Sequence, residues 1–156
     1  MTGDSASGVG IEPHASDSAE QRAAEPLMLK LLGDRLGRTL APASITSQDG
    51  ATVRIDGVSP DGDVLVECWA HQGPAKPAQQ KKLVVDAVKL HWIAGELSER
   101  PDQLILCVSD PAAVRHLQGR SWQRRAIASL GVEVEVVVLP TDVTQRLTAV
   151  QRRQFR

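Results

Sequence analysis

Two carboxylates, Asp56 and Glu67, lie in neighbouring β-like segments that are joined by a tight turn at residues 59–62. Side chains two apart in a strand share a face, so Glu67 falls on one face with Trp69 and His71. The residues between these are apolar, which predicts core on the other face. We expect Asp56 opposite or diagonal to Glu67 across the hairpin. Such a pair suits Mg²⁺ (or Mn²⁺), because Mg²⁺ takes oxygen ligands and usually only one or two protein carboxylates.

Each of these residues also has a simpler interpretation. Asp56-Gly57 is a turn signal, because Asp tolerates unusual backbone angles and caps its own turn. Glu is depleted in strands and has no turn role there, so the alternative for Glu67 is a solvated side chain on an exposed sheet face. His71 would supply a proton donor or a further ligand, or else be an ordinary surface residue at a strand end.

The chain has 156 residues and 42% of them are hydrophobic, which fits one domain with a core of its own. Only 3% are aromatic and none is tyrosine, so the core must be aliphatic, and a stacking platform for single-stranded nucleic acid is disfavoured. Cys68 and Cys107 lie in apolar segments without metal-ligand spacing. We expect them to be buried thiols in a reducing compartment.

The sequence shows neither a membrane signal nor a targeting signal, and we therefore expect a cytoplasmic protein. No apolar run approaches the length of a membrane span, and the N-terminus lacks a basic start followed by an apolar stretch. Residues 1–18 are rich in Ser, Gly, Ala and Asp and are expected to form a disordered tail before a single domain over residues 19–156. The formal net charge of -1 hides an asymmetry, since residues 1–25 carry five acids against one arginine.

Periodicity and turn signals predict an α/β chain in the order α-β-β-β-α-β-α-β-α, with a mixed sheet and helices on both faces. Gly-containing turns at residues 49–50 and 59–62 predict that the early strands form an antiparallel meander, whereas a doubly wound alternative would need parallel ones. The expected helices span residues 19–40, 77–98, 110–131 and a short segment from 141, and the expected strands span 44–48, 52–58, 64–71, 103–109 and 132–139.

Helix, β-meander, helix and strand in this order resemble the core of the PD-(D/E)XK nuclease superfamily, the restriction-endonuclease-like fold, over about residues 27–140. The resemblance implies a Mg²⁺ (or Mn²⁺) site that hydrolyses DNA phosphodiesters. Asp56 looks like the first motif acid and Glu67 like the second, with Cys68 in the variable position between Glu67 and the motif lysine. The pattern then departs from the family, because Trp69 stands where that lysine is expected.

The departure matters because the family's lysine helps to position and deprotonate the attacking water, and tryptophan supplies no cation. In some relatives the lysine has moved to the following helix, where Lys82, or else Lys81, is the candidate. Gln79 is placed like the glutamine that several members carry there. Glu25 resembles the extra N-terminal acid of resolvase-like members, although an acid near a helix N-terminus also has an ordinary stabilising role.

A polar stripe on the predicted helix 77–98 also has an ordinary interpretation. Its members, Gln79, Lys82, Asp86 and Lys89, are spaced for ion pairs within an exposed helix face.

Basic residues favour DNA as a partner. Between residues 71 and 125 there are nine Lys and Arg against five acids, and the segment from Arg146 adds four arginines and no acid. The same excess is ordinary for solvated helices, and the pI of about 6.4 is low for a dedicated duplex-binding domain. A homodimer and a separate protein partner both stay open.

Two functions remain open. One is a metal-dependent nuclease that uses Asp56, Glu67 and Lys82, and the other is a nuclease fold without catalysis that serves as a binding or assembly module. A Trp69 side chain facing solvent beside the acids would allow the first, and one packed over them would favour the second.

Overall fold

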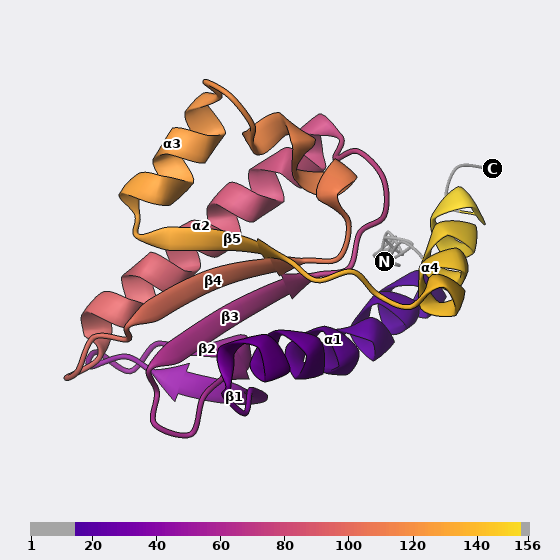
Figure 1. The fold of residues 1–156 in the computed structure, drawn as a ribbon. Helices are drawn as coiled ribbons and strands as arrows, with labels where there is room; N and C mark the ends of the chain where they lie inside the picture. The colour runs from indigo at the N-terminus through magenta and orange to yellow at the C-terminus, as the bar shows by residue number, and fades with distance from the viewer. Residues whose placement is uncertain (1–14, 154–156) are drawn as a thin grey trace, which may run out of the picture.

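The structure is a computed structural model that describes the backbone of residues 15–153 and the side chains of residues 19–153. Its described part is built on a five-stranded mixed sheet (Figure 1). The strands lie side by side in sequence order: β1 (Ala41–Thr46), β2 (Thr52–Val58), β3 (Val64–Trp69), β4 (Gln103–Val108) and β5 (Val132–Val136).

Strand directions divide this sheet into two halves. The pairs β1–β2 and β2–β3 are antiparallel, and the pairs β3–β4 and β4–β5 are parallel. The predicted antiparallel meander is therefore confirmed, and the doubly wound alternative is wrong. The physical reason is the short turns of the first half, since parallel neighbours need a long crossover.

Helices cover both faces of the sheet, as predicted (Figure 1). One face carries α1 (Ala15–Leu36), against which α4 (Thr141–Arg153) packs. The other face carries α2 (Pro77–Glu96), α3 (Trp122–Ser129) and the 3₁₀ helix η1 (Pro111–Leu117). The observed structure is thus a mixed α/β fold with one sheet between two helical layers.

Strand β3 supplies side chains to both core layers. Val66 and Cys68 lie in the layer under α1, whereas Leu65 and Trp69 lie in the layer under α2. The alternation predicted for this strand is confirmed, and it places Glu67 on the α2 side. Both cysteines are buried free thiols, as expected.

Helix α1 differs from its predicted bounds at both ends. It ends at Leu36 because Gly37 adopts a positive φ of 68°, and the Arg38 N–H then donates to the Gly33 carbonyl at 2.9 Å. It begins at Ala15, four residues before the expected start of the domain. The rest of the tail predicted to be disordered, residues 1–14, lies outside the described residues.

The predicted single helix over residues 110–131 is wrong, because the chain forms η1 and α3 there with a break between them. Gly119 has a φ of 67° in this break, a conformation that ends a helix. The Ser121 hydroxyl then accepts a hydrogen bond from the Arg124 N–H at 3.2 Å and so starts α3 as its N-cap.

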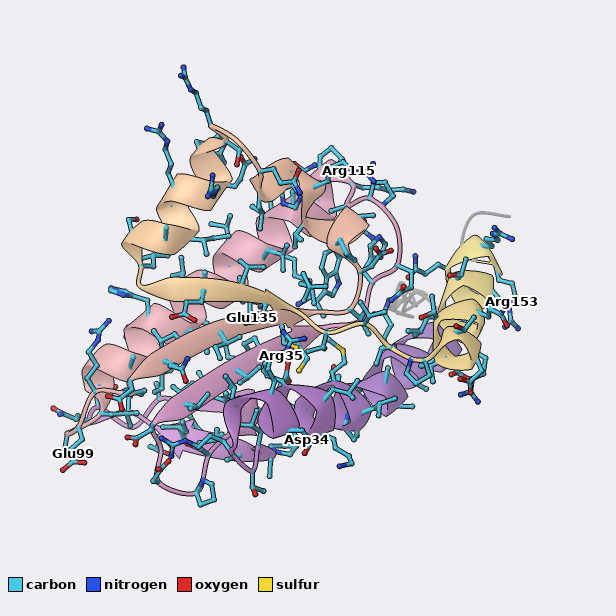
Figure 2. All side chains as sticks on the ribbon, in the orientation of Figure 1. Asp34, Arg35, Glu99, Arg115, Glu135 and Arg153 are labelled. Carbon is cyan, nitrogen blue, oxygen red and sulfur yellow. The ribbon has the colours of Figure 1, made fainter. Side chains whose placement is uncertain are left out.

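An ion pair ties α1 to the edge strand β5 (Figure 2). Arg35 donates to the Glu135 carboxylate at 3.1 Å and to the Val136 carbonyl at 3.0 Å. Unpaired carbonyls on an edge strand invite pairing with other chains, and this contact occupies one of them.

Candidate functional site

Asp56 lies where β2 separates from β3. The two strands are in register at Gly57–Val66 and Val58–Leu65, and beyond these pairs the Asp56 carboxylate accepts the Cys68 N–H at 2.8 Å. The register between β1 and β2 also shifts here, from Ala41–Val58 to Ala43–Ile55, which places one extra residue in β2. A bulge of this kind re-aims side chains. The turn interpretation of Asp56 is therefore wrong, since the residue lies within a strand.

Glu67 is buried in the middle of β3, with 6% of the residue exposed. The solvated interpretation of Glu67 is thus wrong. The Lys89 ammonium group of α2 donates to its carboxylate at 2.8 Å and also to the Arg54 carbonyl. Burial raises the pKa of Glu67 to about 8; the hydrogen bond from Lys89 opposes this rise, and a hydrogen bond and the charge of Asp56 add to it. The structure therefore brings Asp56 and Glu67 together, as expected.

Glu25 belongs to the same electrostatic group, although it comes from α1. Burial raises its pKa to about 7, the negative charge of Asp56 adds to the rise, and Lys82, Arg22 and Arg54 oppose it. Because α1 begins at Ala15, Glu25 lies well inside the helix, and its interpretation as a helix N-terminal acid is wrong.

Lys89, and not Lys82, makes the direct contact with the acids. The Lys82 ammonium pairs with the Asp86 carboxylate at 2.6 Å and reaches the site only through its charge effect on Glu25. Lys81 lines a separate hollow beside α3. The sequence pattern predicted that Lys89 lies on an exposed helix face. Its spacing of seven residues from Lys82 nevertheless places both lysines on one side of α2.

Three other predicted residues have structural partners of their own. Gln79 caps α2, because its side-chain oxygen accepts the Lys76 N–H at 2.9 Å. Trp69 is 6% exposed and packs in the core under α2, so it does not face solvent. His71 stacks on the Trp69 ring at a centroid distance of 4.7 Å, and burial lowers its pKa. The alternative of a surface histidine is wrong, since His71 is buried.

The acid pair fits a hard divalent cation. Among residues 19–153, no group of three or more His, Cys, Asp or Glu side chains is placed to hold a metal ion. Mg²⁺ keeps several waters and uses one or two carboxylates, so Asp56 and Glu67 alone match its requirement. Burial is the main cause of the raised pKa of Glu67, and the nearby Asp56 carboxylate adds to the rise.

Comparison with protein-family models, curated proteins and solved structures found no match. In the described part of the chain, no helix is both long and apolar enough to cross a membrane.

Proposed function

We propose that this chain has a restriction-endonuclease-like fold and acts as a Mg²⁺- or Mn²⁺-dependent nuclease on DNA phosphodiesters. The observation that supports this proposal best is the placement of Glu67, a glutamate buried in mid-strand, beside a second carboxylate and in contact with Lys89. Strand interiors exclude such acids unless a specific arrangement compensates them, and perturbed acids gather at functional sites. The buried free thiols fit the cytoplasmic location expected for this function.

Asp56 and Glu67 would hold the metal. When bound there, the metal polarises the phosphodiester and favours ionisation of a water molecule. The pKa of Glu25 is raised to about 7, so its protonated and ionised forms are both populated at neutral pH. A carboxyl group with this pKa suits a role as proton acceptor.

Lys89 takes the role of the motif lysine that Trp69 replaces. Its ammonium group already lies 2.8 Å from a Glu67 oxygen, on the α2 side of β3. A lysine that enters from the helix supplies the same charge as one on the strand, and it would offset negative charge on the phosphate. The residues Arg22, Arg54 and Lys82 add positive potential that attracts an anionic substrate.

A second candidate is a binding or assembly module without catalysis. It is favoured by the burial of Trp69, which fills the motif lysine position with an apolar ring. The two candidates differ in what Lys89 does, because only the nuclease requires its charge.

The test is cleavage of plasmid and single-stranded DNA in Mg²⁺ and Mn²⁺ by the wild type and by Lys89→Met, Lys82→Met and Glu67→Gln. We expect Lys89→Met and Glu67→Gln to lose activity by a factor on the order of 10²–10³, as for the loss of one charge-stabilising group. Lys82→Met is the comparison on the same helix, and it should lose only a few-fold in activity, because it weakens the attraction of the substrate without removing a contact to the acids.

Two results would contradict this proposal. If a folded wild type cleaves no DNA with either metal, the nuclease function is wrong and the binding module remains. If Lys82→Met loses as much activity as Lys89→Met, the assignment of Lys89 is wrong.

A further inference from the structure

Apolar side chains are exposed where the first half of α2 meets the start of α3. Val85 is 64% exposed and Trp122 is 65% exposed. Together with Lys81, Val84 and Gln123 they line a hollow of about 500 Å³, and we call this surface the α2–α3 face. A large indole in contact with water, beside an open hollow, is unusual in a chain with only three tryptophans.

The segments that form this surface carry an excess of basic residues. Residues 76–85, the start of α2, contain three lysines and no acid, and residues 111–132, which include η1 and α3, contain four arginines and no acid. Arg120, Arg124 and Arg125 are exposed and flank Trp122 in the sequence. The α2–α3 face therefore combines one exposed aromatic ring with a surrounding excess of positive charge.

We propose that the α2–α3 face binds an unpaired nucleic-acid strand, with a base stacked on the Trp122 indole and phosphates held by the flanking arginines. Stacking on an aromatic ring within a basic groove is how proteins hold single strands, because every base presents a π-face. The choice of DNA as the strand rests on the proposed function. The sparse aromatic content disfavours a platform of several rings, but the α2–α3 face needs only one.

Neighbouring lysines connect this face to the acid site. Lys81 lines the hollow, and Lys82 acts on Glu25 through its charge. Because these residues are consecutive on α2, one strand that lies across the helix can contact both. An unpaired segment on the α2–α3 face would then extend toward Asp56 and Glu67.

Two other occupants fit less well. A second copy of the chain would place one mainly basic surface on another, and like charges across an interface oppose association. A fully paired duplex keeps its base faces stacked inside the helix, so it offers nothing to the exposed indole. Both remain as outcomes of the test.

The experiment measures binding of a labelled oligothymidylate of about ten nucleotides by fluorescence anisotropy at low salt, with EDTA and full-length protein. We expect Trp122→Ala to weaken binding about tenfold, the effect of losing one stacked base. Trp92→Ala is the matched control, because Trp92 is 37% exposed in the half of α2 that carries Glu96. It should bind like the wild type. An abasic oligomer should bind wild type and Trp122→Ala equally, which separates stacking from charge.

The measurement stands apart from the cleavage assay because it needs no metal and leaves Asp56 and Glu67 unchanged. Binding that depends on Trp122 in a protein that cleaves nothing would support this face and overturn only the nuclease function. Wild-type affinity in folded Trp122→Ala, absence of oligonucleotide binding, or equal dependence on Trp122 for a blunt duplex would overturn the proposal. A dimer that Trp122→Ala dissociates would instead assign the face to a second copy.

Discussion

Glu67 and Lys89 form the contact on which the candidate site depends. The lysine bonds the carboxylate at 2.8 Å, and 31% of the lysine side chain but only 7% of the glutamate side chain is exposed. Even at this distance the lysine does not fully offset the desolvation of the buried carboxyl, because the pKa of Glu67 stays raised at about 8. Lys89 also donates to the Arg54 carbonyl, which fixes it over β2 and β3. Under the proposed function, Lys89 supplies the positive charge that Trp69 cannot.

The pKa of Glu67 predicts how the stability of the metal-free protein depends on pH. The ordinary value is 4.5 and the folded value is about 8, so the folded state keeps a proton that the unfolded state releases between these values. The free energy of unfolding should therefore fall as pH rises through this range, by on the order of 2 kcal/mol from this group. Glu25, with a pKa of about 7, contributes in the same direction.

The measurement is urea unfolding in EDTA across this pH range for the wild type and Glu67→Gln. The amide does not ionise, so the variant should show a clearly smaller fall in stability. Identical pH profiles for the two proteins would contradict this prediction, because they would mean that burial does not raise the pKa of Glu67.

At the scale of elements, the site depends on how closely α1 approaches β2. A Cβ atom added to Gly57 would lie 2.4 Å from Leu29 Cδ2 and 3.4 Å from Val66 Cβ. Only glycine lets the helix pack at this distance, directly beside the bulge that carries Asp56. The close approach of α1 to β2 also explains why Glu25, a residue of the helix, interacts electrostatically with Asp56 of the strand.

Gly57→Ala should accordingly destabilise the protein by about 1–3 kcal/mol, the usual cost of overpacking a core. Leu29→Ala in the same background should relieve the overlap, so that the double variant is more stable than the sum of the single changes predicts. Thermal and urea unfolding measure both.

Gly95→Ala is the control for this cycle. It lies in α2, where an added Cβ would meet no atom within 4 Å apart from its neighbours in the chain and its own helix backbone. It should leave stability unchanged or raise it by about 0.5–1 kcal/mol through helix propensity. Additivity between the changes at positions 57 and 29 would contradict the close approach of α1.

Sequence patterns predicted the elements well where the signal is local. Alternation in β3 placed Glu67 on the correct face, and the glycine turns gave the antiparallel pairs. The break between η1 and α3 was missed because one glycine, Gly119, ends the first segment inside an otherwise helical pattern. The side-chain cap by Ser121 is a local signal that could have located it.

The sequence predicted the two acids of the candidate site, but it did not predict the lysine that contacts them. Asp56 and Glu67 follow from strand alternation and hairpin geometry, which are local properties. The choice between Lys82 and Lys89 depends on where α2 lies along β3, and this is set by packing between elements far apart in the sequence. Periodicity places both lysines on one side of a helix but does not say which one lies above Glu67.

Across the molecule, the three acids of the candidate site come from α1, β2 and β3, and the two lysines nearest to them come from α2. The acids are Glu25, Asp56 and Glu67, and the lysines are Lys82 and Lys89. The basic α2–α3 face continues outward from those lysines. Under the proposed function, a nucleic-acid strand would meet this positive charge before it reached Asp56 and Glu67.

The most direct test is calorimetric titration of Mg²⁺, and then Mn²⁺, into the wild type, Asp56→Asn, Glu67→Gln and the exposed control Glu99→Gln. Asp56→Asn keeps an oxygen that accepts the Cys68 N–H, so it should stay folded while losing a metal ligand. We predict one site in the wild type and in Glu99→Gln, and none in the other two variants. No binding by the wild type, even with DNA present, or binding that survives either substitution, would contradict the metal site.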